Sequence, residues 1–540
     1  MMSDETQNSK LETRNLKLDR RWKAIYLGAI VFVSLPYAIS FTSQLCSDDF
    51  ILLHYYGTRP LWRILGFFLP RTLWTYHPLQ HYYFAVGWHI SGIEPWAYRT
   101  MSLAVHFGTA LLLLKLGRDL TDSIHVGGCA AVVFAGQWRQ WEAISWAASI
   151  ATPESTFFSA LACVAFLSFL RRRRVAAYMG MILASMGWFF SKETIIQLPL
   201  LLVAIYFYRR WYERNGLTQF ATRNSKLSEA TEWRDLVRLL AAPVAIVAVY
   251  LVFYALFVHN VYTLAKLGYE KMPVKDWPSN TFTWLDYALN PLVENEVVMA
   301  LGGGMLMQIA RWYLVSAAVI LITFYLALFR RRMLPLFALT LTLILMIPYV
   351  ALRCPYLCFR YYYGLMPGVA LLVVALGYEA LRSAGKKRGG WQSWLRIVVG
   401  AAGGLWVVAS IAQLANCALH DRDANRVSRE LYDFFASQPD KADRPVLFVV
   451  DTGHVQHDVD VELGWGLLEC ARLALRSDKI AAVELGFDLD RNLLKEFNGY
   501  SEKYLVLRKE DGWWSSRLPD EFRLTIAPGE QGGVALEKGP

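Results

Sequence analysis

Two adjacent carboxylates, Asp48 and Asp49, follow directly after the first long apolar run of the chain. Carboxylates at a bilayer boundary are costly unless they are solvated, paired or used in chemistry. Because neighbouring side chains on a helix or strand point in different directions, one can face a reaction site while the scaffold holds the other. Such a group can deprotonate an acceptor hydroxyl or ligate a divalent cation, Mg²⁺ or Mn²⁺. Capping of the next helix by Ser47, Asp48 or Asp49 is the competing role.

Other charged residues recur at the ends of later apolar runs, on the same side of the membrane as the acidic pair. They are Arg139 and Glu142, Lys192 and Glu193, and Arg353 and Arg360, the last followed by Tyr361, Tyr362 and Tyr363. Each alone is explained by snorkelling or helix capping, and the tyrosines by an aromatic belt. Together they have the groups needed to hold a lipid phosphate and to activate an acceptor beside it.

The composition indicates that these residues belong to a membrane protein. Of 540 residues, 55% are hydrophobic and only 19% are charged, whereas soluble proteins carry about 25% charged residues. A disordered, collagenous or disulfide-scaffold chain is excluded. Basic and aromatic residues are not concentrated in a soluble surface, so nucleic acid is not an expected partner.

Eleven apolar runs are long enough, or nearly so, to cross a bilayer. They centre on residues 24–43, 95–114, 123–137, 154–170, 175–190, 194–208, 239–258, 306–329, 334–351, 362–381 and 395–416. We therefore predict a mainly α, polytopic membrane protein with about eleven transmembrane helices, to which a small C-terminal α/β soluble domain is attached.

Clusters of Lys and Arg give the orientation, because cytoplasmic loops carry an excess of cations. With the tail at residues 1–23 in the cytoplasm, all clusters fall on the cytoplasmic side; they lie at 171–174, 209–210, 330–332 and 386–388. The membrane domain then covers residues 24–418, with outer loops at 44–94 and 259–305. The expected location is a bacterial inner (plasma) membrane.

Residues 419–540 are predicted to form the soluble extracytoplasmic domain. Residues 421–540 hold 16 Lys and Arg against 23 Asp and Glu, whereas residues 1–420 hold 39 against 22. Val446–Val450 and Tyr504–Leu507 are typical of short buried strands, and Leu463–Leu475 has helical spacing. Asp451 is either a turn residue or a functional group at the end of a strand.

A series of short motifs covers residues 24–385 in a fixed order. They are Asp48-Asp49; Tyr76-His77-Pro78-Leu79; Gly92, Pro95, Tyr98 and His106; Glu142-Ala143-Ile144-Ser145-Trp146; Ser191-Lys192-Glu193; Asn290-Pro291; and Arg360-Tyr361-Tyr362-Tyr363. The ordered set resembles the membrane-embedded GT-C glycosyltransferases, especially the protein O-mannosyltransferases and the bacterial aminoarabinose transferases. No single motif is specific, whereas the set with matching topology is.

The resemblance implies an inverting glycosyltransferase, hexosyl or pentosyl, that moves a sugar from a polyprenyl-phosphate donor to an acceptor on the extracytoplasmic face. The acceptor, a protein, lipid or glycan, is unknown. Asp48 is the preferred general base and Asp49 the alternative. Lys192, Arg353 and Arg360 would bind the donor phosphate; Glu193, Tyr361, Glu142, Arg139 and His77 would complete the substrate site.

The chain departs from its relatives in one cationic contact. His77 stands where relatives often have Arg before Pro-Leu, and Ser149-Ile150 where they often have Gly-Arg. One cationic contact of the family is therefore either missing or supplied by Arg139, and the donor sugar is left open. No cofactor is required by the resemblance. A divalent cation at Asp48 and Asp49 is the one candidate.

Three alternatives compete with this prediction. A transporter or flippase of lipid-linked sugars would place polar residues at several depths of the membrane, whereas here they concentrate on one side, with Glu379 as the main exception. A ligase or polymerase that uses diphosphate-linked donors would have an Arg-rich outer loop and no early acidic pair. A non-catalytic scaffold would keep the acidic pair far from Lys192 and Arg360.

Overall fold

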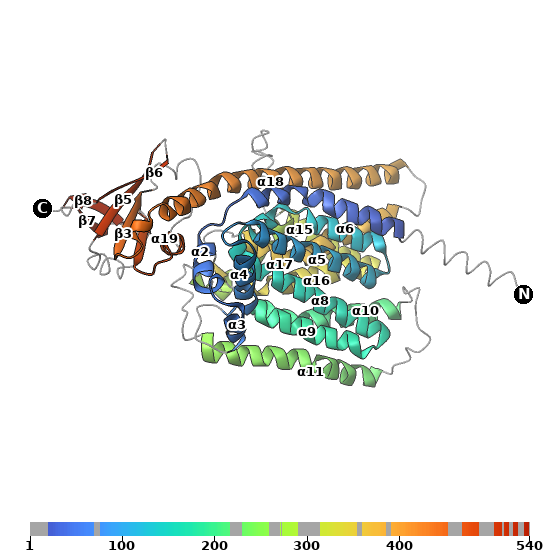
Figure 1. Ribbon diagram of the computed structural model, residues 1–540. Helices are drawn as coiled ribbons and strands as arrows, with labels where there is room; N and C mark the ends of the chain where they lie inside the picture. Colours follow the sequence, from blue (N-terminus) through green and yellow to red (C-terminus); the bar gives the residue numbers. More distant parts are fainter. Residues whose placement is uncertain are drawn as a thin grey trace, which may run out of the picture.

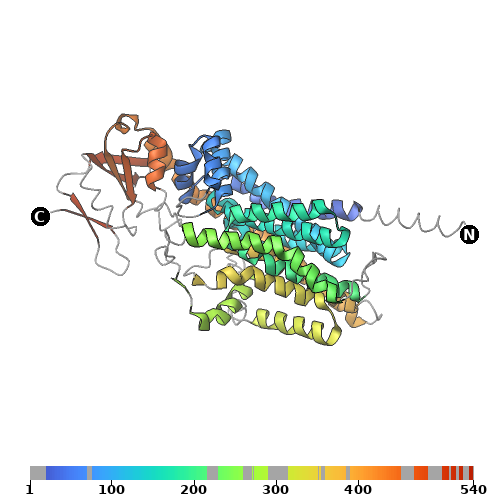
Figure 2. The same cartoon turned by 90° about the horizontal axis from the view of Figure 1, so that it is seen from below.

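The computed structural model is a bundle of apolar helices with a small sheet at one end (Figures 1 and 2). It describes residues 20–69, 76–215, 229–258, 270–271, 273–289, 314–350, 352–353, 359–384, 390–451, 467–484, 502–509, 512–517, 522–526 and 534–538. All eleven predicted apolar runs fall wholly or partly on helices of this bundle.

Six helices of the described residues are long and apolar enough to cross a membrane. They are Arg20–Thr42, Trp96–Thr121, Ala147–Arg172, Leu236–Leu256, Met333–Val350 and Tyr362–Arg382. Three shorter apolar helices accompany them: Ile124–Ala135, Val175–Ser191 and Val315–Arg330. The chain is thus an integral membrane protein by length and composition of its helices, and the total of eleven spans stays a prediction.

The helices of the bundle have these bounds: η1 Leu35–Thr42, α5 Trp96–Thr121, α6 Ile124–Ala135, α8 Ala151–Arg172, α9 Val175–Ser191, α10 Leu198–Arg214, α11 Glu229–Phe253, η7 Tyr254–Val258, α15 Leu314–Arg330, α16 Met333–Val350, α17 Tyr362–Ala384 and α18 Gly390–Ala436. Helix α5 packs against α6 and α8, α8 against α9, and α16 against α17. Gly127 lets α6 approach α5, because a Cβ there would overlap the carbonyl oxygen of Leu114. Small residues allow such close approach between membrane helices.

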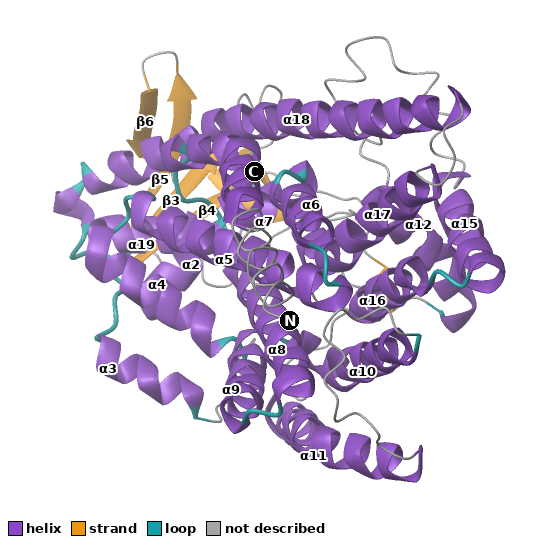
Figure 3. Cartoon of the chain, turned by 90° about the vertical axis from the view of Figure 1, so that its right-hand side faces the viewer, coloured by secondary structure: helices purple, strands orange, loops and turns teal. Residues whose placement is uncertain are grey.

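Short helices and turns connect the bundle at one end, which we call the outer end because the predicted orientation places it outside. They are α2 Asp48–Leu52, η2 Leu53–Gly57, α3 Leu61–Ile64, η3 Leu65–Phe68, α4 Pro78–Ser91, η4 Trp138–Gln140, α7 Trp141–Ser145, η5 Ala147–Ile150, η6 Glu193–Gln197, η9 Val274–Asp276, α12 Trp277–Leu289 and η10 Phe359–Tyr361, with strands β1 Glu270–Lys271 and β2 Leu352–Arg353. Viewed along the bundle (Figure 3), α2, α3 and α4 lie together on one side. Trp62, Leu65 and Leu69 are exposed there, as expected for a segment in the membrane interface.

The C-terminal segment forms the predicted α/β domain. Its four-stranded sheet has the order β4-β3-β5-β6, in which β3 is parallel to both neighbours and β6 is antiparallel to β5. The elements are η11 Pro439–Lys441, β3 Val446–Asp451, α19 Leu467–Leu475, β4 Ile480–Glu484, β5 Glu502–Lys509 and β6 Gly512–Arg517; β7 Phe522–Ile526 and β8 Val534–Lys538 form a separate pair. Both predicted strands and the predicted helix are present.

Helix α18 differs from the predicted span at 395–416. It is continuous from Gly390 to Ala436 and runs beside the bundle into the C-terminal domain (Figure 1). The predicted boundary between 418 and 419 therefore falls inside a helix. The continuous apolar run ends near residue 416, but the helix continues, because its later half packs against the outer end of the membrane domain and buries Val427, Leu431 and Phe435 at helical spacing.

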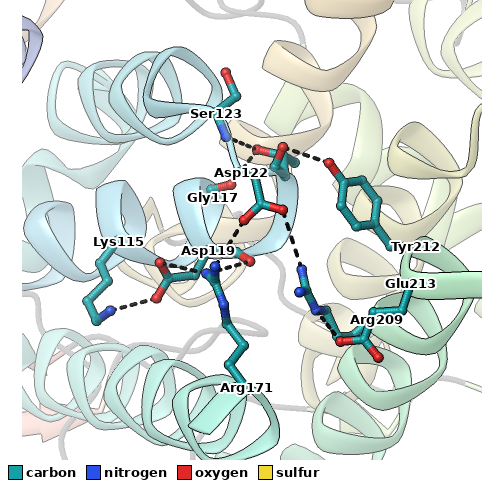
Figure 4. Close-up of polar contacts among 10 residues, drawn as sticks. Lys115, Gly117, Asp119, Asp122, Ser123, Arg171, Arg209, Tyr212 and Glu213 are labelled. Atoms are coloured by element: carbon teal, nitrogen blue, oxygen red, sulfur yellow. Dashed lines mark hydrogen bonds and ion pairs between the residues drawn. The ribbon is translucent and has the colours of Figure 1, made fainter. Parts of the chain in front are cut away.

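The opposite end of the bundle holds a network of ion pairs between helix ends (Figure 4). Asp119 accepts from Lys115 at 2.6 Å and pairs with Arg171 at 3.2 Å. Arg171 also donates to Asp122 at 3.0 Å, while Arg209 pairs with Glu213 at 2.9 Å. The network ties the ends of α5, α8 and α10 together, on the side to which the predicted orientation assigns the cytoplasm.

Candidate functional site

The acidic pair begins the short helix α2, and its two members have different surroundings. Asp49 is fully buried; its Oδ2 accepts a hydrogen bond from the Cys46 amide at 3.1 Å and its Oδ1 one from the Ala148 amide at 2.7 Å. Asp48 is half-buried. Ser47, directly before the pair, has φ +46° and makes no capping bond with its side chain. A positive φ is costly for a residue other than glycine and tends to occur at functional sites.

The environment of Asp49 disfavours its charged form. Burial raises the pKa of this carboxyl to about 7, although the Arg99 guanidinium and the two backbone amides lower it. Hydrogen bonds from two backbone amides use one acceptor position on each oxygen. Asp49 is therefore held by the scaffold, and of the two carboxylates Asp48 is the one with exposed surface.

Arg99 and Asp421 also belong to this region, and the sequence analysis selected neither of them. Arg99 is fully buried near the start of α5, and its Nη2 donates to the carbonyl oxygen of Gln44 at 3.2 Å. Asp421, on α18, accepts hydrogen bonds from Trp141 Nε1 and from Ser145 Oγ, the latter at 3.0 Å. Burial raises the pKa of Asp421, whereas its donors lower it. An arginine within an apolar helix was the one signal that pointed to Arg99.

Arg360 and Glu142, which are 218 residues apart in the sequence, form an ion pair at the outer end. Arg360 Nη1 lies 2.6 Å from Glu142 Oε1, and the Arg360 amide donates to Oε2 at 2.9 Å. The guanidinium lies over the rings of Trp146, at 4.6 Å, and Tyr361, at 5.2 Å. The carboxylate thus fixes both the backbone and the side chain of Arg360.

Lys192 lies next to Arg360 and is 6% exposed. Its Nζ donates to Thr152 Oγ1 at 2.7 Å and lies 5.0 Å from the centre of the Tyr361 ring. Burial lowers the pKa of Lys192, the charge of Glu193 raises it, and that of Arg360 lowers it further. An anion bound at this point would offset the cost of burying the charged Lys192 and would reduce the repulsion between the two cations.

Glu193 points to a different partner. Its Oε2 lies 3.1 Å from His77 Nε2. The Glu193 side chain is 48% exposed. The surrounding protein raises its pKa, but the hydrogen bond with His77 and the charge of Lys192 bring it down to about 2. His77, which stands where relatives often have Arg, is therefore next to the cation cluster and is held there by Glu193.

One short stretch, from Trp141 to Thr152, contacts each of these groups. Glu142 holds Arg360, the Ala148 amide holds Asp49, and Thr152 holds Lys192. It comprises α7, η5 and the start of α8, and Asp421 fixes its first turn. The structure therefore brings residues from four distant parts of the sequence to the two sides of one connection.

Arg139 and Arg353 have other surroundings. Arg139 is fully buried, with its guanidinium 4.4 Å from the Trp138 ring and 5.3 Å from that of Tyr287. Burial raises the pKa of Asp286 on α12, although hydrogen bonds with Ser316 and the charge of Arg139 oppose the shift. Arg139 thus connects η4 to α12 through packing. The Arg353 backbone pairs with Glu270 between β2 and β1. Its side chain, like Asn290 and Pro291, lies outside the described residues.

No group of three or more His, Cys, Asp or Glu side chains that could hold a metal ion occurs within the described ranges. A cation at Asp48 and Asp49 would have to compete with the backbone amides that already bind Asp49. The metal site therefore stays a prediction.

No family model and no curated protein matches the chain. Among solved structures, ArnT from Cupriavidus metallidurans bound to undecaprenyl phosphate is similar over 95% of this chain and 97% of its own, with 12% identity and a TM-score of 0.46. Its apo form has 12% identity and a TM-score of 0.44 over 96% and 98% of the two chains.

Proposed function

We propose that the chain is an inverting glycosyltransferase that transfers a sugar from a polyprenyl-phosphate donor to an acceptor at the extracytoplasmic face of the membrane. The observation that carries the proposal is the connection Trp141–Thr152, which joins an acidic pair on one side to two neighbouring cations on the other. Transfer from a phosphate requires these two kinds of group: a base for the acceptor and cations for the leaving phosphate.

Each group has a definite part in the reaction. Asp48 takes the proton of an acceptor hydroxyl while that oxygen attacks the anomeric carbon from the face opposite the phosphate. The bond between the anomeric carbon and the phosphate oxygen breaks, and its electron pair stays on the polyprenyl phosphate. Lys192 and Arg360 stabilise the charge that develops on that oxygen. Removal from water makes such fixed charges more effective than they would be in solution.

The neighbouring residues position these groups. Glu142 and Trp146 hold the Arg360 guanidinium on two sides, and Tyr361 lies against both cations. His77 and Glu193 lie beside Lys192, where a donor sugar would be held by hydrogen bonds. Asp49, bound by two amides, fixes the helix that carries Asp48. The half-buried state of Asp48 favours it over Asp49 as the base.

The position of the site at the end of apolar helices suits a lipid donor. A polyprenyl chain can lie beside the spans while its phosphate reaches the membrane surface, so lateral diffusion delivers the donor. In this proposal the N-terminus is cytoplasmic, the C-terminal domain is extracytoplasmic, and the membrane is a bacterial inner membrane.

Binding of the donor's carrier gives the direct test. The purified protein in nanodiscs is titrated with undecaprenyl phosphate and, as a matched control, with undecaprenol. Native mass spectrometry measures the fraction of protein bound to each lipid. We expect saturable binding of the phosphate only, weakened in Lys192→Met. Equal binding of both lipids would contradict a phosphate site. Undecaprenyl diphosphate is the third ligand, and a clear preference for it would favour the ligase or polymerase alternative.

Mass spectrometry of cell-envelope glycans and glycoproteins from cells with and without the protein identifies the sugar and the acceptor. We expect one modification to disappear with the protein and with Asp48→Asn. An unchanged envelope together with altered distribution of a lipid-linked sugar between leaflets would favour a flippase. Transfer that survives EDTA and is not increased by Mg²⁺ or Mn²⁺ would exclude the cation at the acidic pair.

A further inference from the structure

The short helix η5, in the middle of the connection Trp141–Thr152, has faces that can be told apart. It is a 3-10 helix, in which residues three apart lie on the same face. Ala147 and Ile150 share one face; both are fully buried, in the same apolar cluster as Phe50 of α2 and Tyr98 of α5. Packing therefore occupies this face.

A second face carries Trp146 and Ser149, with Thr152 one turn further along. The Ser149 amide donates to the Trp146 carbonyl oxygen at 3.0 Å, which closes the turn. At one end of this face, the Trp146 ring lies 4.6 Å from the Arg360 guanidinium. At the other end, Thr152 Oγ1 accepts a hydrogen bond from Lys192 Nζ at 2.7 Å. Ser149 therefore stands between the points at which the two cations contact the connection.

The hydroxyl of Ser149 is buried without a hydrogen-bond partner. Its side chain is 5% exposed, and its Oγ makes no hydrogen bond with any described residue. Burial of an unpaired hydroxyl costs free energy. Ser155 and Ser159, which follow on α8, avoid this cost because each donates to a backbone carbonyl oxygen one turn earlier, at 2.9 and 2.8 Å. The unpaired hydroxyl thus distinguishes Ser149 from the next two serines of the chain.

We propose that Ser149 is a binding residue for the phosphate of the lipid carrier: its hydroxyl donates a hydrogen bond to a phosphate oxygen between Lys192 and Arg360. The inference rests on the proposed function and adds a neutral donor to its phosphate site. A hydroxyl rotates about a single bond, so it can turn toward an anion that binds beside it. Trp146 Nε1, on the same face, is also buried and makes no hydrogen bond with a described residue, so this face offers two neutral donors.

A neutral donor suits a site that already holds two cations. A third cation would repel Lys192 and Arg360, whereas a hydroxyl adds no charge. Hydrogen bonds to an ionised oxygen are about twice as strong as those between neutral groups. The hydroxyl of Ser149 therefore destabilises the protein without ligand, because it is unpaired, and stabilises the complex with the phosphate. Its removal should affect stability and affinity in opposite directions.

Loss of the hydroxyl in Ser149→Ala gives the test, with Ser155→Ala as the matched control because that serine is paired within its own helix. Native mass spectrometry in nanodiscs measures the affinity of the full chain for undecaprenyl phosphate and for undecaprenol. We expect Ser149→Ala to weaken binding of the phosphate about 10-fold, since the hydroxyl donates to a charged group. Ser155→Ala should bind the phosphate as the wild type does, and neither substitution should change binding of undecaprenol.

Thermal unfolding provides a second measurement on the same variants. Without added lipid, Ser149→Ala should melt at the same temperature as the wild type or higher, because the hydroxyl that it removes is unpaired. Undecaprenyl phosphate should raise the melting temperature of the wild type more than that of Ser149→Ala, because the stabilisation by a ligand follows its affinity.

Two results would overturn the inference about Ser149. One is equal affinity of Ser149→Ala and the wild type for undecaprenyl phosphate; the other is a lower melting temperature of Ser149→Ala without lipid, which would give the hydroxyl a structural role. Either result, in a chain that binds undecaprenyl phosphate and not undecaprenol, leaves the proposed function intact. Equal binding of the two lipids by the wild type would overturn the proposed function and the inference together.

Discussion

The two ends of the helical bundle both gather charged residues, but they treat these charges differently. In the inner network (Lys115, Asp119, Asp122, Arg171, Arg209 and Glu213), three cations face three carboxylates through direct ion pairs. At the outer end, Arg360 is paired with Glu142, but the neighbouring Lys192 donates to a hydroxyl and lies over an aromatic ring, and its pKa is lowered by burial and by Arg360 although Glu193 raises it. Charges that neutralise one another hold helices together, whereas a buried cation that donates to a neutral group keeps its affinity for an anion.

Removal of the proposed base at the outer end should have the largest effect. Asp48→Asn should reduce transfer about 100- to 10,000-fold, because general base catalysis contributes about that much. Initial rates of sugar transfer from the donor identified by envelope analysis measure the effect. Asp119→Asn in the inner network is the control and should retain transfer. Equal losses in both variants would mean that the outer carboxylate acts only through stability.

Removal of a cation should have the next largest effect. Lys192→Met should weaken binding of undecaprenyl phosphate by roughly 10- to 100-fold, since a charge-assisted hydrogen bond contributes about 1.5–3 kcal/mol. Lys115→Met removes a cation of the inner network and should leave this affinity unchanged while it lowers the melting temperature. Native mass spectrometry in nanodiscs gives both affinities. Undiminished binding by Lys192→Met would place the phosphate elsewhere.

Substitution of Asp421, which does not belong to the proposed phosphate site, should reduce transfer by a smaller factor. Asp421→Asn keeps the shape of the side chain but weakens its hydrogen bonds with Trp141 and Ser145. We expect transfer to fall about 10-fold, because the connection that carries Glu142 would shift. A displacement of even a fraction of an ångström in a group that positions the substrate slows the reaction. Addition of the second substitution Ser145→Ala should then cost little, because the two residues share one contact. Independent, multiplicative losses would contradict the shared role.

The buried carboxyl of Asp49 at the outer end should make the stability of the protein depend on pH. Its pKa of about 7 lies above the value near 3.9 expected in an unfolded chain. The contribution of Asp49 to stability is therefore fully present below about pH 4 and is lost as the pH rises through about 7. The melting temperature of the wild type should fall between pH 5 and 8 more steeply than that of Asp49→Asn. Identical slopes would show that Asp49 is ionised throughout.

Much of the architecture could be predicted from local sequence. The eleven apolar runs fall on helices, and the strands at Val446 and Tyr504 and the helix before Leu475 appear in the C-terminal domain, because their hydrophobic periodicity is local. Arg99 and Asp421 could not be found in this way. Each stands in a helix whose pattern continues past it, and its importance comes only from a partner more than 40 residues away.

The sequence alone determined the membrane class and the residue types available for chemistry, since hydropathy and charge are properties of each segment. Only the tertiary structure decided which of these residues meet. It separated Asp48 from Asp49 by burial, paired Arg360 with Glu142 and placed Arg139 among aromatic rings. The physical reason is that packing of helices far apart in the sequence sets the burial and the neighbours of each charge, and these determine what the charge can do.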